Sequence, residues 1–249
     1  MAKLFVCSDI HSAYTPWMKA LKEAGFDKDN EDHKIIVCGD LFDRMDESEL
    51  VYEFVKDMMG KNKLIYILGN HEGLMLECIH RGYAARHDWS NGTAKSIIDL
   101  APHATNFYDA CAVTYEKVKP LFDKAVNYFE SQNYIFVHSW IALKCNDDLP
   151  PYYTKNRKFE FDPDWRYAHA SAWETARWGN PFQLAEEGFL PDKKLIFGHW
   201  GTYEARPRDY EGEDLFDIFY GDGYIGLDAT TALSGQVNVL VLEDTFLEE

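Results

Sequence analysis

Three short polar strings each follow an apolar run within the first third of the chain, and this pattern constrains the fold more than any other feature. The strings are Ser8 to His11, Gly39 to Arg44 and Gly69 to Glu72. The runs before them, Lys3 to Cys7, Ile35 to Cys38 and Leu64 to Leu68, have the continuous hydrophobicity that is typical of central strands covered on both faces. Polar side chains that follow successive parallel strands can meet at one edge of a sheet, which sequence neighbours on a helix could not do.

The segments between these predicted strands have the features of helices. Thr15 and Pro16 supply an N-cap and a proline at the first helical position, and Gly25 marks the end of the first helix. Glu47 to Met59 is also helical in pattern, and Gly60 ends it. The order strand, helix, strand, helix, strand predicts a parallel βαβαβ unit with right-handed crossovers.

The rest of the chain predicts a helical middle followed by more strands. Apolar residues at helical spacing cover Leu74 to Ile79, Thr93 to Leu100 and Tyr115 to Phe129. Further strand-like runs are Tyr134 to Val137, Lys194 to Phe197, Tyr224 to Leu227 and Val237 to Leu242. The first two of these runs end at His138 and at Gly198-His199. A turn containing Ser and Gly separates the last two, so we expect them to form an antiparallel hairpin.

Lys144 to Phe182 is rich in aromatic residues and prolines, and we interpret it as an insertion between two of the motif strands. Two interpretations of its aromatic residues stay open. They can form a satellite core beneath a long loop, or they can line one wall of a substrate cleft, because long loops in compact domains are often functional.

Size and charge exclude several classes of protein. The 249 residues and 46% hydrophobic content predict one domain, residues 1–249, with a large core. The formal net charge of −17 repels phosphate backbones and argues against a nucleic-acid groove. The first apolar stretch is too short for a signal peptide or a membrane span, so we expect a cytoplasmic protein that does not bind membranes. Five cysteines without a CxxC pair argue against disulfides and a zinc–thiolate site.

Six residues at the ends of the predicted strands are candidate metal ligands. They are Asp9, His11, Asp40, Asn70, His138 and His199. A lone Asp or Asn at a strand end is commonly a turn former, but the first three strand ends recur about every thirty residues and favour a metal site. Carboxylate, imidazole and amide donors together suit Mn²⁺, Fe²⁺ or Zn²⁺ better than Mg²⁺ or Ca²⁺.

Two ions are expected, because these donors divide into two sets with one shared member. Asp40 on the middle motif is the natural bridge, Asp9 and His11 would hold one ion, and the other three residues would hold the second. Two ions roughly 3.5–4 Å apart hold a bridging hydroxide that attacks phosphorus in line. The sequence therefore predicts a phosphoester hydrolase without a covalent intermediate.

Three residues beside these ligands are candidate catalytic groups. His71 follows Asn70 and can donate a proton to the leaving group, provided that a carboxylate holds its other ring nitrogen. Asp43 is the carboxylate that we expect there. Arg44 offers a guanidinium to the phosphate oxygens.

These motifs resemble those of calcineurin-like metallophosphoesterases, and more narrowly those of the phosphoprotein phosphatases with their bacterial and phage members. The family pattern is Asp-x-His, Gly-Asp-x-x-Asp-Arg, Gly-Asn-His-Glu, a lone His and a Gly-His, and the residues named above match it nearly end to end. The resemblance implies an α/β fold, a sandwich of two mixed β-sheets flanked by α-helices, with a dinuclear site usually active with Mn²⁺. It also implies a second phosphate-binding arginine between His138 and His199. Arg177 is the best candidate, and Arg157 and Arg166 are weaker ones.

The chain departs from the family pattern at several loops. Many phosphodiesterases of the wider superfamily carry a second His two residues beyond the Gly-His, where this chain has Gly201. This favours the phosphoprotein phosphatases and the related dinucleoside polyphosphatases. Ser12 and Met45 replace glycines that are usual in the narrower family, and Ser139-Trp140 replaces a small pair. We expect these changes to affect substrate preference rather than the chemistry.

Three functions are therefore weighed for this chain. The leading one is a serine/threonine protein phosphatase, a metal-dependent phosphomonoesterase. The second is hydrolysis of dinucleoside polyphosphates such as diadenosine tetraphosphate, in which aromatic residues of the 152–178 stretch would stack on the bases. The third, a catalytically silent binding protein, is disfavoured because every expected ligand is present.

Overall fold

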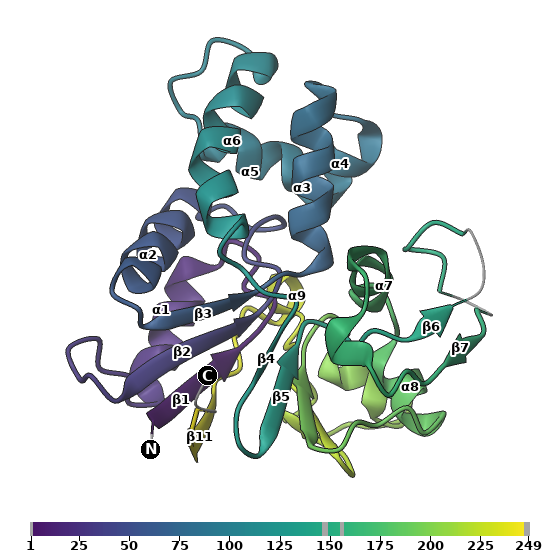
Figure 1. The fold of residues 1–249 in the computed structure, drawn as a ribbon. Coiled ribbons are helices and arrows are strands. Elements are labelled where there is room, and N and C mark those ends of the chain that lie inside the picture. Colours follow the sequence, from purple (N-terminus) through teal and green to yellow (C-terminus); the bar gives the residue numbers. More distant parts are fainter. Residues whose placement is uncertain (1, 146–148, 155–156, 247–249) are drawn as a thin grey trace.

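Two mixed β-sheets form the centre of the computed structural model, which describes residues 2–145, 149–154 and 157–246 (Figure 1). The first sheet has the order β11-β1-β2-β3. Its strands are β1 (Ala2–Cys7), β2 (His33–Cys38), β3 (Leu64–Ile67) and β11 (Leu240–Asp244). β1, β2 and β3 are mutually parallel, and β11 is antiparallel to β1. The parallel unit predicted from the first three apolar runs is thus present.

The second sheet has the order β4-β5-β8-β10-β9. Its strands are β4 (Tyr128–Glu130), β5 (Tyr134–Val137), β8 (Lys194–Phe197), β10 (Tyr224–Gly226) and β9 (Phe219–Tyr220). β5, β8 and β10 run parallel, while β4 and β9 pair antiparallel at the two edges. The predicted sandwich of two mixed sheets is confirmed.

The alternating direction of side chains along the strands explains how the two sheets pack. Leu4 and Val6 of β1 belong to a cluster with Phe136 and Ile196 of the second sheet, whereas Phe5 faces the opposite side, among the helices. Successive side chains of a strand point to opposite faces, so one continuous apolar run supplies both layers of core.

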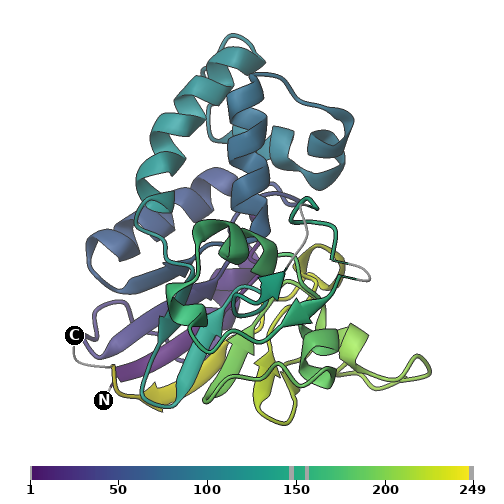
Figure 2. The ribbon, with the colours of Figure 1, turned by 45° about the vertical axis from the view of Figure 1, so that its right-hand side comes forward.

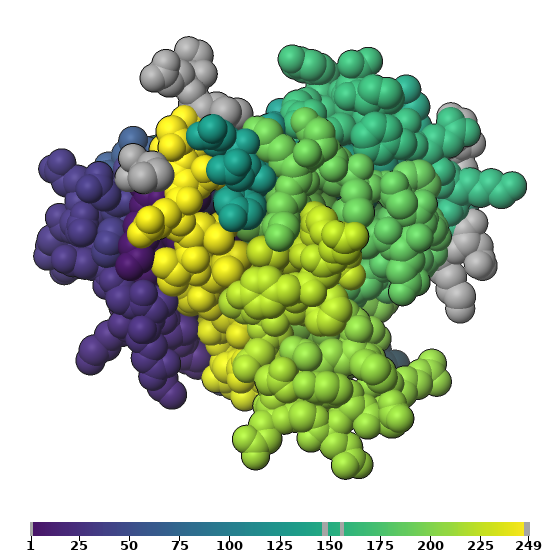
Figure 3. Space-filling model, turned by 90° about the horizontal axis from the view of Figure 1, so that it is seen from below, coloured from purple at the N-terminus to yellow at the C-terminus, as the bar shows by residue number. Residues whose placement is uncertain are grey.

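The predicted hairpin of the last two apolar runs is wrong. Tyr224 to Leu227 contains β10 of the second sheet, while β11 pairs with β1 in the first. Between them the chain forms the short helix α9 (Thr231–Ser234) and crosses from one sheet to the other. Leu227 and Leu240 still share the core between the sheets, so both runs are apolar without being partners. In the view from below, the yellow C-terminal segment lies between the purple N-terminal residues and green residues of the other sheet (Figure 3).

Two helices cover the outer face of the first sheet. α1 (Tyr14–Glu23) and α2 (Ser48–Gly60) lie close to their predicted positions. Trp17 of α1 and Val51 and Val55 of α2 are fully buried against this face. Thr15 lies inside α1 rather than capping it, and its backbone N–H donates to Glu47 at 2.8 Å, so a carboxylate from another segment satisfies a first-turn donor.

Four helices form a lobe that stands above the sheets (Figures 1 and 2). They are α3 (Asn70–Arg81), α4 (Arg86–Asn91), α5 (Thr93–Asp99) and α6 (Phe107–Phe122). The helix expected over Tyr115 to Phe129 is wrong at its end, since α6 stops at Phe122 and Phe129 lies in β4. Phe129 packs against Phe136 of the neighbouring strand, and a short apolar run does not distinguish strand from helix by spacing alone.

The insertion forms a small unit beside the second sheet (Figure 1). Its elements are β6 (Lys144–Cys145), β7 (Phe159–Glu160), the 3₁₀ helix η1 (Trp165–Tyr167), α7 (Ala170–Ala176) and α8 (Pro181–Glu186). Trp165, Trp173 and Phe182 are buried in a satellite core, whereas Tyr152 and Tyr167 are 57% and 89% exposed. The aromatic residues thus divide between a core and a surface. Within the described ranges, no helix combines the length and the apolar character that crossing a membrane requires.

Candidate metal centre and active site

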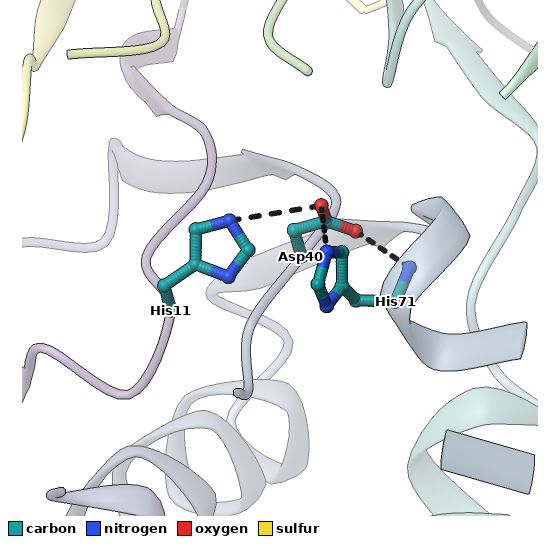
Figure 4. A group of neighbouring side chains, drawn as sticks. All are labelled: His11, Asp40 and His71. Carbon is teal, nitrogen blue, oxygen red and sulfur yellow. Dashed lines mark hydrogen bonds and ion pairs between the residues drawn. The ribbon is translucent and has the colours of Figure 1, made fainter. Parts of the chain in front are cut away.

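Two groups of possible metal ligands meet at the carboxyl ends of the parallel strands, and Asp40 belongs to both. The first group joins Asp40 to His11 and His71, and the second joins Asp40 to His138 and His199. Within each group the ligand atoms lie within 4.8 Å of one another. Figure 4 shows the first group, with the His11 and His71 side chains on either side of the Asp40 carboxylate. One carboxylate shared by two pairs of histidines matches the chemistry of a two-ion site.

The tautomer of His11 is fixed by the backbone. Its Nδ1–H donates to the carbonyl of Phe42 at 3.0 Å, so the lone pair is on Nε2. Nε2 lies 3.8 Å from the Asp9 carboxylate and 3.8 Å from that of Asp40. Burial lowers the pKa of His11 well below its ordinary value, which keeps the ring neutral. Two carboxylates and an imidazole lone pair therefore converge on one point.

The second group brings ring nitrogens and an amide oxygen close together. Nδ1–H of His138 donates to the carbonyl of Cys38 at 2.8 Å, which leaves a lone pair on Nε2. That Nε2 lies 2.8 Å from Oδ1 of Asn70 and 3.1 Å from Nδ1 of His199. Burial lowers the pKa of His138 well below normal and that of His199 to about 3. Neutral rings at these positions can offer nitrogen lone pairs to a cation bound between them.

The two candidate carboxylates are costly in this position without a cation. Asp9 and Asp40 are each 1% exposed, and burial raises the pKa of both well above the ordinary value for aspartate. Asp228 adds to the shift at Asp9, and Glu72 adds to that at Asp40. Divalent ions between these groups would offset the repulsion. The residues present thus fit two divalent ions with nitrogen and oxygen ligands.

Backbone strain is concentrated at the same place. Asp9, His11, Asp40 and His199 all have φ between 49° and 68°, in the left-handed region that non-glycine residues rarely occupy. Such conformations persist where the surrounding structure holds them, and they cluster at functional sites. Here they occur in the three loops that follow β1, β2 and β8, where the candidate ligands meet.

A buried dyad stands beside the first group. Nδ1 of His71 lies 2.7 Å from Oδ2 of Asp43, which is fully buried. Thr93 donates its hydroxyl to the same oxygen at 2.5 Å, and the Asp43 N–H donates to Ser96 at 2.9 Å. Nε2 of His71 then faces Asp40 at 4.0 Å and Nη2 of Arg44 at 3.5 Å. The carboxylate expected behind His71 is in place, although Nε2 also lies within reach of the ligand cluster.

Two further carboxylates belong to this site and have no role in the sequence-based account. Glu72 accepts from the backbone N–H groups of Gly69 at 2.7 Å, Leu41 at 3.0 Å and Asp40 at 3.2 Å. It therefore ties two motif loops together, and a Glu three residues after the residue that precedes a helix is the pattern that signals such a cap. Asp228 lines the hollow above the ligands, and burial raises its pKa to about 6. Like the other motif residues, Asp228 directly follows an apolar run, Tyr224 to Leu227.

The candidate second arginine lies outside the immediate cluster. Arg177 lines a neighbouring hollow, and its Nη2 donates to Asn127 at 2.5 Å. Arg166 is held by Glu130 at 2.8 Å and Asp192 at 2.9 Å. Arg157 donates to the carbonyl of Leu149 at 2.9 Å. The charge of Arg177 interacts with those of Glu72 and Asp40.

Two hollows open at the centre. The first, which we call the central hollow, has a volume of about 610 Å³ and is lined by five candidate ligands together with Arg44 and His71. The second, the side cleft, measures about 730 Å³ and lies between α3 and the insertion. Asn70, Leu74 and Trp178 line both, so the two hollows join beside the metal ligands.

The sequence of this chain is similar to those of known phosphoesterases. The sequence model of the calcineurin-like phosphoesterase family matches residues 2–225. An asymmetrical bis(5′-nucleosyl)-tetraphosphatase of Bacillus velezensis is 25% identical over 220 residues, which cover 82% of this chain and 78% of that protein.

Solved structures share the fold at low identity. A cold-active protein-tyrosine phosphatase of a Shewanella species superposes with a TM-score of 0.56 and 14% identity, over 98% of this chain and 76% of the other. A protein serine/threonine phosphatase of Saccharomyces cerevisiae gives a TM-score of 0.52 and 13% identity, over 100% and 81%.

Proposed function

The chain belongs to the calcineurin-like phosphoesterase family, and from this premise we propose that it is a Mn²⁺-dependent phosphomonoesterase that acts on phosphoserine and phosphothreonine in proteins. The observation that carries the proposal is the convergence of ligand atoms on Asp40. His11 Nε2 lies 3.8 Å and His138 Nε2 3.6 Å from its carboxylate oxygens, and Asn70 Oδ1 and His199 Nδ1 lie 2.8 Å and 3.1 Å from His138 Nε2, which is a donor set that suits divalent ions.

Six residues would hold two ions. Asp40 would be a ligand of both ions. Asp9 and His11 would be the other ligands of one ion, and Asn70, His138 and His199 those of the other ion. Divalent ions bound there would activate a water as the nucleophile and neutralise phosphate charge. The carbonyls of Phe42 and Cys38 orient two of the imidazoles, which is the support that metal-binding histidines need.

The chain's own residues would handle the proton and the phosphate. Asp43 holds Nδ1 of His71 at 2.7 Å, so that Nε2 can deliver a proton to the departing serine or threonine oxygen. Arg44 lies next to Nε2, with its Nη2 at 3.5 Å, where it can hold the phosphate oxygens during the transfer. Arg177, beside Asn70 in the side cleft, is the candidate for a second phosphate contact.

Gly201 supports a monoester substrate over a diester. A Cβ at this position would lie 2.7 Å or less from two ring carbons of Tyr203 and would meet the Thr230 hydroxyl. The additional His of the diesterase pattern therefore has no room here. Without it, the position offers no side chain to hold a second ester group.

Hydrolysis of dinucleoside polyphosphates is the second candidate, and the relative in Bacillus velezensis favours it. Trp178 and Trp200 line the central hollow and can stack on bases. The charge of the chain, −17, opposes it, because such a substrate brings several negative charges to an acidic protein.

One experiment ranks the two candidates. The purified protein with Mn²⁺ is given a phosphoserine peptide and diadenosine tetraphosphate side by side, and kcat/KM is measured for each. We expect the peptide to be hydrolysed faster, with one solvent oxygen entering the phosphate. Faster turnover of the nucleotide by orders of magnitude would reject the protein phosphatase assignment, and no turnover of either would favour a binding protein.

A further inference from the structure

We propose that the side cleft binds the peptide segment next to the phosphorylated residue and selects a basic side chain there. The inference rests on the proposed protein phosphatase function. It concerns the surface between α3 and α7, which face each other in Figure 1 and whose residues line the cleft.

Continuity with the metal centre gives the cleft its role. Asn70, a candidate ligand, lines both hollows, and so do Leu74 and Trp178. A phosphate held at the metal centre would therefore leave the adjoining chain at the entrance of the side cleft. The volume of about 730 Å³ is that of a ligand-sized pocket, large enough for several side chains.

The walls suit a peptide side chain with an apolar stem. On α3, Asn70, Gly73, Leu74 and Glu77 line the cleft, because residues three and four apart share one helix face. The opposite wall includes Tyr152, whose ring centroid lies 6.1 Å from that of Trp178. The long stem of Lys or Arg packs along such apolar and aromatic surface while its charge stays near the rim.

The charges at the rim favour a cation. Glu77 has a side chain that is 64% exposed, and its partner Arg81 at 3.0 Å is also bound to the buried Asp88. One guanidinium thus serves two carboxylates. Across the cleft, Glu174 is exposed. The guanidinium of Arg177 donates to Asn127 and divides its electrostatic interaction between Glu72 and Glu174.

Two carboxylates, those of Glu77 and Glu174, and one guanidinium, that of Arg177, therefore line the cleft, in a chain with a net charge of −17. A basic peptide complements this surface, whereas a polyphosphate is repelled by it.

The test measures binding, so that it does not depend on turnover. Fluorescently labelled peptides carry a phosphonate, which cannot be hydrolysed, in place of the phosphate ester. Each peptide has Arg, Ala or Glu two or three residues before or after the phosphonate residue. Dissociation constants with Mn²⁺ are compared for the wild type, for E77Q/E174Q, and for E23Q/E53Q. The last variant makes the same change of charge on α1 and α2, at exposed positions outside both hollows.

We expect the Arg peptide to bind roughly 3- to 10-fold more tightly than the Glu peptide on at least one side, the range for two exposed charge contacts. E77Q/E174Q should bring that ratio close to one, and E23Q/E53Q should retain most of it. The proposal is overturned if the wild type shows no preference, if both variants lose it equally, or if diadenosine tetraphosphate binds more tightly than every peptide. A failure of the proposed function is a different result, namely no phosphate release from phosphopeptides by the wild type with Mn²⁺.

Discussion

The metal centre and the side cleft meet at Asn70, yet they are built in opposite ways. Five of the six candidate ligands are buried, His199 being partly exposed, and two are oriented by the backbone carbonyls of Phe42 and Cys38. The side cleft consists of the outer face of α3 and an insertion whose Tyr152 is 57% exposed. The difference teaches that the groups proposed for the chemistry are fixed by the sheets, whereas those proposed for substrate choice are surface side chains that can change without disturbing the sheets.

Asp40→Asn should have the largest effect, because it removes charge from the residue that both ligand groups share. We expect loss of at least one ion and a fall in kcat/KM of roughly 10⁴-fold or more, equivalent to the several kcal/mol that metal ions contribute. Elemental analysis and steady-state kinetics measure the two effects. Full metal occupancy in the variant would contradict the bridging role.

His71→Asn tests whether His71 is the acid or a ligand, because its Nε2 lies within reach of the ligand cluster. We expect bound metal to be retained while kcat falls by roughly 10²- to 10⁴-fold, the range for loss of a general acid. His103→Asn, at an exposed position, is the control. Loss of an ion would make His71 a ligand, and unchanged turnover would remove it from the mechanism.

Glu72→Gln should have an intermediate effect, because it acts through the backbone. An amide would bring its NH₂ toward N–H groups of Gly69, Leu41 and Asp40 that now donate to the carboxylate. We expect about 1–3 kcal/mol of lost stability and roughly 10- to 100-fold weaker metal binding or activity. Chemical denaturation and metal titration measure these changes, with Glu116→Gln on the exposed face of α6 as the control. Normal metal affinity would show that Glu72 does not position the ligands.

Tyr152→Ala should have the smallest effect, since it changes only the side cleft. We expect KM for a phosphopeptide to rise by roughly 2- to 5-fold, as for a partly exposed aromatic contact, with kcat nearly constant. Peptide kinetics at saturating Mn²⁺ give both constants. A fall in kcat comparable to that of His71→Asn would erase the distinction between the two regions.

The sequence predicted the three parallel strands of the first sheet and brought most of the candidate ligands to one edge, for a local reason. Asp9, Asp40 and Asn70 each follow a buried strand directly, so a polar residue at the end of an apolar run was enough to place them together. It also paired His71 with Asp43, the carboxylate three residues beyond the candidate bridging residue Asp40, and the two side chains are in contact.

The predictions that failed depended on contacts between distant segments. The last two apolar runs do not pair with each other, since β10 pairs with β8 in the second sheet and β11 pairs with β1 in the first. Phe129 belongs to β4 because Phe136 packs beside it, which no spacing along residues 115–129 reveals. The positioning role of Glu72 and the placement of Asp228 follow from three-dimensional neighbours as well, although their sequence patterns were visible.

Anomalous diffraction at the manganese absorption edge, from crystals grown with Mn²⁺, is the most direct test of the central claim that acceptor groups converge here to hold two ions. We predict two peaks that share Asp40, one beside Asp9 and His11 and the other beside Asn70, His138 and His199. A single peak, or no peak at Asp40, would contradict the account.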